Sequence, residues 1–237
     1  MSVNPNNKNL SKILYDKFFL VDLREYFNND GISYDNLKCD GNFDSLGATY
    51  PAEELPESNS IIKIKQIPFF FPSKDDGFTN NMVLNGQTIC VESGKYKTMY
   101  ILGAVEGSGG EVYEEDVTIS FENGAYETVN LCLSNWMLPA EYEEMLAFYC
   151  SHLHHPDAGQ KAMSNSKYQD IENYIDCTDI KYTMAYDRTS DEADAKKGIW
   201  HPRIWMQKVD LKFSEKIAAL TFMENMNFHV FSITLES

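Results

Sequence analysis

Three of the five histidines in this chain, His152, His154 and His155, lie within four residues, and Asp157 follows them. In a strand His152 and His154 share a face, and in a helix His152 and His155 do. Either geometry presents two imidazoles to a transition metal, with Asp157 or the distant His201 as a further ligand. The glycine and glutamate that flank the histidines of a cupin-type oxygenase or isomerase are missing. The alternative is a solvated helix C-terminus, where cationic imidazoles suit the helix dipole.

A second candidate metal site is the segment that contains Asp40, Asn42 and Asp44. Oxygen side chains at every second position are typical of a tight loop around calcium. An EF-hand is excluded because Ser45 stands where the loop needs glycine and Pro51 where it needs a bidentate glutamate. A structural calcium ion in a sandwich loop and a plain Asx turn both remain open.

Aromatic residues indicate a third chemistry, the stacking of a flat ring on the apolar face of a sugar. The candidates are Trp136, Trp200 and Trp205, with Tyr182 and His201 as neighbours in the binding site. Trp200 and Trp205 are five positions apart, so in an unbroken strand they point to opposite faces. One of them would then be core and the other exposed. The competing interpretation places every tryptophan in the core.

Other catalytic patterns are weaker. Groups of adjacent acidic residues suggest a glycosidase, which needs two facing carboxylates: Glu53-Glu54, Glu114-Glu115-Asp116 and Glu143-Glu144. Adjacent carboxylates point apart, however, so the sequence singles out no acid and base. The five cysteines are odd in number and contain no CxxC pair, which indicates reduced thiols in the cytoplasm.

The net charge of −16 disfavours nucleic acid and anionic membranes as partners. The first part of the chain has no apolar run of the length an export signal requires, and no window approaches the roughly 20 apolar residues of a membrane span. We therefore expect a soluble cytoplasmic protein. Hydrophobic residues make up 43% of the chain, which is ample for a core.

Most elements that would position these residues are predicted to be strands. Residues 117–121 and 129–133 alternate in polarity around Asn123-Gly124, which is a strong hairpin pattern. Helical spacing behind Pro139 predicts one short helix over 139–149. We expect a flexible arm over 1–17, and one domain over 18–237 with an insertion at about 139–198. Further strands are predicted at 61–67, 69–71, 99–104, 180–186, 204–211, 217–222 and 228–235.

Several segments resemble a known β-sandwich module. They include Tyr26-Phe27-Asn28-Asn29-Asp30-Gly31 and Leu133-Ser134-Asn135-Trp136, and the likeness extends through 41–56, 68–72, 85–89, 101–104, 216–221 and 229–235. The module is similar to accessory regions of bacterial glycoside hydrolases of the α-mannosidase type, and to small stand-alone bacterial proteins. In place of the aspartate usual before the tryptophan, this chain has Asn135. The resemblance implies an all-β, jelly-roll or galactose-binding-like sandwich that takes part in carbohydrate processing without catalysis of its own.

The first hypothesis is thus a carbohydrate-binding or glycosidase-accessory protein, with a saccharide or a partner glycosidase as its partner. The alternative is a metal-assisted isomerase, lyase or hydrolase of a small sugar-derived substrate, built on the histidines. A third is a pure interaction subunit that docks through 139–198. The sequence leaves the oligomeric state open.

Overall fold

The computed structural model describes residues 14–15, 17–34, 41–75, 77–107, 113–154, 201–212 and 215–237. These residues form strands almost throughout, with one 3-10 turn, η3 (Ala52–Glu54). No helix in these ranges has the length and apolar character needed to cross a membrane. The expected strand at 180–186 lies outside the described residues.

The larger sheet has seven strands in the order β1-β2-β15-β9-β13-β12, and β7 also pairs with β15. Its central strand β9 is buried along its whole length. The neighbouring strands within this sheet are antiparallel. The strands are β1 (Leu14–Tyr15), β2 (Phe18–Val21), β7 (Met82–Asn85), β9 (Thr98–Val105), β12 (Met145–Tyr149), β13 (Arg203–Asp210) and β15 (Glu224–Glu236).

The second sheet has four strands in the order β11-β10-β14-β8. These are β8 (Thr88–Lys95), β10 (Glu114–Phe121), β11 (Tyr126–Cys132) and β14 (Lys216–Phe222). Burial alternates along β10 and β11, as it does in a sheet with one face on a core and the other in water. The predicted hairpin between them is confirmed, and Gly124 takes the positive φ of 84° that its turn requires.

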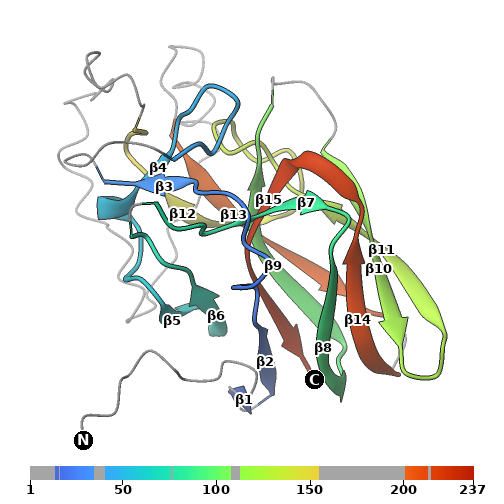
Figure 1. Ribbon diagram of the computed structural model, residues 1–237. Coiled ribbons are helices and arrows are strands. Elements are labelled where there is room, and N and C mark those ends of the chain that lie inside the picture. The colour runs from blue at the N-terminus through green and yellow to red at the C-terminus, as the bar shows by residue number, and fades with distance from the viewer. Residues whose placement is uncertain are drawn as a thin grey trace, which may run out of the picture.

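Two small two-stranded units complete the structure. The strands β3 (Ile32–Ser33) and β4 (Tyr50–Pro51) pair in parallel, and β5 (Ser60–Ile64) pairs with β6 (Ile67–Phe71) in a hairpin. Figure 1 shows β3 and β4 near β12 and β13 on one side of the molecule, and β8, β10, β11 and β14 on the other. A backbone bridge between Thr49, just before β4, and His154, which follows β12, links the β3–β4 unit to the segment after β12.

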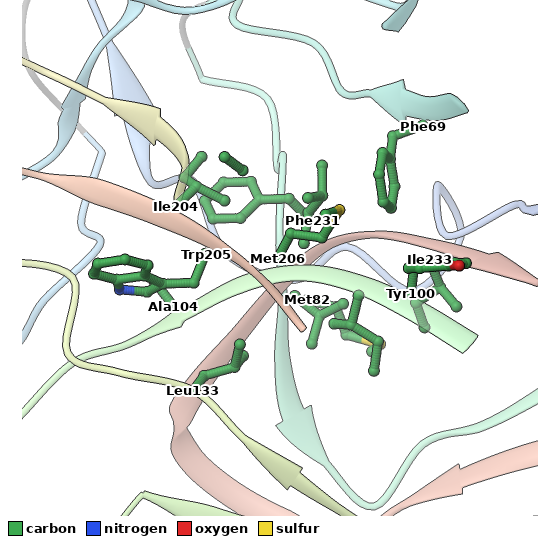
Figure 2. Packing of buried hydrophobic residues seen from close by; sticks show 14 of the residues in the cluster. Phe69, Met82, Tyr100, Ala104, Leu133, Ile204, Trp205, Met206, Phe231 and Ile233 are labelled. Atoms are coloured by element: carbon green, nitrogen blue, oxygen red, sulfur yellow. The ribbon is translucent and has the colours of Figure 1, made fainter. Parts of the chain in front are cut away.

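The core is one large apolar cluster in which rings from distant segments meet, with a small second cluster of Leu20 and Phe70. In the large cluster, the ring centroid of Phe43 lies 4.8 Å from that of Tyr50, 4.6 Å from that of Trp136 and 4.1 Å from that of His229. Figure 2 shows Trp205, Ile204, Leu133 and Phe231 among the buried side chains of this cluster. The all-β sandwich expected from the sequence is confirmed.

The helix predicted over 139–149 is wrong. Met145 to Tyr149 form the edge strand β12, which pairs with β13 so that Met145 lies opposite Met206 and Leu146 opposite Trp205. A helix of so few residues has little stability of its own. The neighbouring strand instead supplies hydrogen-bond partners to a segment rich in β-forming aromatic residues. The first part of the expected insertion is therefore a strand of the larger sheet.

Candidate functional site

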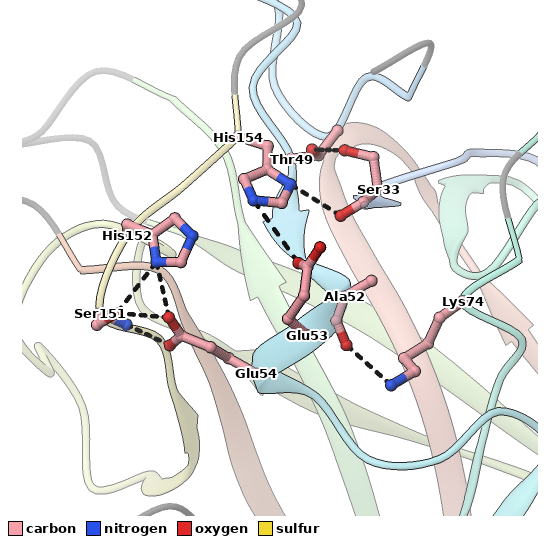
Figure 3. A network of polar contacts seen from close by, with 9 residues as sticks. All are labelled: Ser33, Thr49, Ala52, Glu53, Glu54, Lys74, Ser151, His152 and His154. Atoms are coloured by element: carbon pink, nitrogen blue, oxygen red, sulfur yellow. Dashed lines mark hydrogen bonds and ion pairs between the residues drawn. The ribbon is translucent and has the colours of Figure 1, made fainter. Parts of the chain in front are cut away.

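Two glutamates and two histidines meet where η3 approaches the end of β12. We refer to Glu53, Glu54, His152 and His154 as the His–Glu cluster; Figure 3 shows it with its neighbours. The 3-10 turn follows Pro51, whose fixed φ suits the position before a helical turn. Three residues per turn send Glu53 and Glu54 in directions about 120° apart. Each carboxylate therefore reaches a different histidine.

A buried lysine fixes the turn that carries the glutamates. Lys74 Nζ donates hydrogen bonds to the carbonyl oxygens of Ala52 at 2.8 Å and Leu55 at 2.9 Å. The Ala52 carbonyl also accepts the turn's own hydrogen bond from the Leu55 N–H at 3.4 Å. The Leu55 carbonyl lies just past the turn, where backbone acceptors lack partners within the helix. Burial lowers the pKa of Lys74, although nearby carboxylates oppose the effect. The amine thus holds the backbone of η3 in place beneath the two glutamates.

Glu54 accepts several hydrogen bonds from the segment after β12. The backbone N–H of Ser151 donates at 2.6 Å, the Ser151 hydroxyl also donates, and His152 Nδ1 lies 2.7 Å from Oε1. Burial alone would raise the pKa of Glu54, but the bonds from His152 and Ser151 outweigh it and hold that pKa below its usual value. Glu54 is therefore an ionised carboxylate that orients His152.

His154 is the most buried member of the cluster, with 2% of its side chain exposed. Its backbone pairs with Thr49, and its Nδ1 lies 2.9 Å from the carbonyl oxygen of Ser33. A carbonyl can only accept, so Nδ1 carries the proton and donates. Within the described residues Nε2 has no hydrogen-bond partner and lies 3.7 Å from Glu53 Oε2. The rings of His152 and His154 have centroids 5.2 Å apart.

The structure thus brings together two of the predicted metal ligands, His152 and His154, whereas Asp157 and His155 lie outside the described residues. His201 is buried, and its ring stacks on Tyr149 with centroids 4.7 Å apart. Across the described ranges, no three or more His, Cys, Asp or Glu side chains are already arranged to hold a metal ion. The transition-metal site stays a prediction.

Two of the predicted sugar-stacking residues are corrected by their burial. Trp136 is 2% exposed and Trp205 is fully buried. The Trp205 indole N–H donates to the carbonyl oxygen of Asn135 at 3.2 Å, which satisfies its polar atom inside the core. Neither ring can stack on a sugar, because side chains of the core cover both. Trp200 and Tyr182 lie outside the described residues.

The predicted calcium segment forms a local turn in its described part. Asp44 Oδ1 accepts hydrogen bonds from the N–H groups of Leu46 at 3.0 Å and Ala48 at 2.9 Å. This is the pattern of an Asx turn, in which the side chain replaces a backbone acceptor. Asn42 is exposed and donates its backbone N–H to the Asp30 carbonyl at 2.6 Å, while Asp40 lies outside the described residues. Calcium binding stays a prediction.

We expect Asp44→Ala to lower the free energy of unfolding by about 1–2 kcal/mol, because two backbone N–H groups lose their acceptor. Asp44→Asn keeps a side-chain oxygen and should cost less than half as much. Urea denaturation of the three proteins without calcium measures both effects. Equal stability of the alanine variant and the natural chain would show that this turn does not depend on the carboxylate.

The described cysteines give no support to a nucleophilic thiol. Burial raises the pKa of Cys132 and places that of Cys150 well above its usual value, whereas a reactive cysteine needs a lowered one. Cys90 is exposed, Cys132 is half-buried and Cys150 is buried. Cys39 and Cys177 lie outside the described residues.

Sequence reasoning missed Ser33 and Lys74 in the site, and it missed the roles of Glu53 and Glu54. Adjacent carboxylates do point apart, as expected, but the structure places one histidine against each of them. No local pattern identifies Lys74, whose partners lie about twenty positions away. The pairing of Glu54 with Ser151 spans 97 residues and depends on the fold.

Comparison with protein families places this architecture among known domains. A family model described as the AziU2-like beta-sandwich domain matches residues 17–237. A search of curated proteins found no significant match.

Proposed function

We propose that this chain, which belongs to the AziU2-like β-sandwich domain family, is a non-catalytic carbohydrate-binding protein. Its ligand site would be the His–Glu cluster, and its ligand a saccharide, either in solution or carried by a partner glycosidase. The observation that carries the proposal is the arrangement of two partly exposed groups, Glu53 and His152, around His154. Glu53 Oε2 lies 3.7 Å from His154 Nε2, the His152 and His154 ring centroids are 5.2 Å apart, and Lys74 fixes the backbone of η3.

The cluster offers the groups that sugar hydroxyls need. Glu53, with 42% of its side chain exposed, can accept hydrogen bonds from two neighbouring hydroxyls. The imidazole of His152 is 28% exposed and can donate or accept according to its protonation. Carboxylates form the stronger, charge-assisted bonds. A rigid polar set of this kind favours a polyhydroxylated ligand over an apolar one.

An aromatic ring for the apolar face of a sugar is supplied by Tyr34, not by the buried tryptophans. The Lys74 ammonium lies 6.0 Å from the centroid of the Tyr34 ring, so the tyrosine sits beside η3. The carboxylates of Asp75, Glu53 and Glu57 add to the effect of burial in raising the pKa of Tyr34. Its phenol therefore stays protonated and can donate to a hydroxyl at neutral pH.

The protonation of Glu54 supports binding over glycoside hydrolysis. A glycosidase needs one carboxylic acid whose pKa is raised so that it can protonate the leaving group. The pKa of Glu54 is instead lowered, and its oxygens are occupied by Ser151 and His152. It acts as a fixed acceptor that positions His152.

Calorimetric titration of the chain with a panel of mono- and oligosaccharides tests this proposal. At least one sugar should bind in the millimolar range or better, and Glu53→Gln should weaken it about tenfold or more, because a bond to a charged group contributes about 1.5–3 kcal/mol. The matched control is Glu57→Gln, an exposed glutamate near the same turn, which should leave the affinity unchanged. Absence of binding across the panel, or equal loss in both variants, would overturn the proposal.

A further inference from the structure

We propose that the His–Glu cluster binds one divalent transition-metal ion such as zinc through His152 Nε2, His154 Nε2 and the carboxylate of Glu53. The inference goes beyond saccharide binding and does not require it. Three features of the cluster lead to it: a buried imidazole nitrogen that faces a carboxylate, outer partners that orient both rings, and spacings compatible with one shared ion.

The first feature is His154 Nε2. His154 is almost wholly buried, and Nε2 has no hydrogen-bond partner among the described residues. Burial of a polar atom without a partner is unfavourable, so such atoms usually have a role. Because Nδ1 donates to the Ser33 carbonyl, the neutral form of the ring has its lone pair on Nε2, the atom that lies 3.7 Å from Glu53 Oε2. This is the tautomer that a metal requires.

The second feature is the set of groups behind the two rings. Histidines that bind metals usually donate their other N–H to a carbonyl or a carboxylate, which fixes the ring and raises its basicity. His154 has the carbonyl of Ser33 in this role, and His152 has the carboxylate of Glu54 at 2.7 Å. Both outer partners are thus in place on opposite sides of the cluster, as Figure 3 shows.

The third feature is distance. The 5.2 Å between the ring centroids of His152 and His154 is close to the spacing of about 5 Å expected when two imidazoles share one tetrahedral zinc. Glu53 Oε2 lies 3.7 Å from His154 Nε2, a little more than the roughly 3.4 Å between two ligands of one zinc ion. The carboxylate must therefore turn inward for the three donors to converge. A partly exposed glutamate can do so by a change of rotamer.

The chemistry of the donor set also selects the metal. Two imidazoles and one carboxylate suit zinc or iron(II) better than calcium, which prefers oxygen ligands alone. Three protein ligands leave at least one coordination position open. A hydroxyl of a bound saccharide or a water molecule could take that position, so the ion would add a strong contact to the ligand site proposed above.

Calorimetric titration of the chelator-treated full chain with zinc chloride tests the inference, using protein made without a polyhistidine tag. We expect one zinc ion per chain, and a loss of affinity of more than about 100-fold in Glu53→Gln and in His152→Gln. Glu54→Gln keeps all three ligands and should weaken binding by about 10–100-fold through the orientation of His152. The control Glu57→Gln should bind like the natural chain. Cobalt(II) absorption reports the ligand set independently.

Binding without a defined stoichiometry, or unchanged affinity in Glu53→Gln and His152→Gln, would overturn the inference. Both side chains are partly exposed, so these variants should fold, and circular dichroism checks that they do. Repeating the sugar titrations with and without zinc separates the two proposals. If the chain binds zinc but no sugar, only the saccharide proposal is overturned. If the chain binds a sugar but fails to bind zinc in the titration, only this inference is overturned.

Discussion

Replacing Trp205 with alanine is expected to lower the free energy of unfolding by about 3–5 kcal/mol. The indole is fully buried, and Trp205 lies in β13 opposite Gly103 of β9 and Leu146 of β12. Truncation removes its apolar contacts, leaves a cavity and frees the Asn135 carbonyl from the indole N–H. Urea denaturation followed by circular dichroism measures the loss.

An exposed aromatic residue provides the control for this prediction. Tyr126 begins β11 with 70% of its side chain exposed, so Tyr126→Ala should change stability by less than about 1 kcal/mol. The comparison also distinguishes core packing from a role in sugar stacking. A Trp205→Ala protein with undiminished stability and impaired sugar binding would contradict the burial described here.

Acid is expected to destabilise the protein through His229 well before its carboxylates are protonated. This histidine is buried in β15, its ring lies 4.1 Å from that of Phe43, and its Nδ1 lies 2.8 Å from Asn81 Oδ1. Burial lowers the pKa of His229 from 6.5 to about 3. The folded state therefore keeps the ring neutral at pH values where the unfolded chain binds a proton.

The direction of the pH effect follows from this difference. Below the unfolded pKa the unfolded state binds more protons, so the free energy of unfolding falls by about 1.4 kcal/mol per pH unit down to the folded pKa. At pH 5 the natural chain should have lost about 2 kcal/mol through this group. The glutamine in His229→Gln can still donate to Asn81 and does not titrate. Between pH 7 and pH 5 the free energy of unfolding of this variant should therefore fall by about 2 kcal/mol less than that of the natural chain.

The pH window matters because other groups titrate below it. The lowered pKa values of Asp22, Glu54 and Glu236 also remove stability in acid, but only as the pH falls through and below their usual range near 4. The remaining histidines are present in both proteins and cancel in the comparison. Identical slopes for the natural chain and His229→Gln between pH 7 and pH 5 would contradict the neutral, buried state of this ring.

The two proposals for the His–Glu cluster share a physical basis in how the cluster is held. Lys74 fixes the glutamates from below, while the Thr49 bridge and the Ser33 carbonyl fix His154 from behind. A site whose side chains are held by outer partners loses little entropy on binding. The cluster can therefore give useful affinity for a small ligand without a deep cavity.

The elements of the sandwich were largely predictable because their patterns are local. Alternation along β10 and β11, and Asn123-Gly124 between them, predicted the hairpin that the structure contains. The strands β9, β13, β14 and β15 each extend an apolar run recognised in the sequence. The helix prediction over 139–149 failed because helical spacing and β-forming residues coincide in this segment. Whether it forms a helix or a strand depends on pairing with the partner strand β13.

The sequence alone determined an acidic chain with ample core material and strands separated by turns, since neighbouring residues suffice to encode these features. Only the tertiary structure decided that Trp205 is core and that Glu53 meets His154, residues about a hundred positions apart. Burial and long-range pairing depend on which strands pack together, and this information is distributed over the whole chain. For the same reason the histidines could be recognised as candidates from sequence, whereas the pairing of Glu53 and Glu54 with them could not.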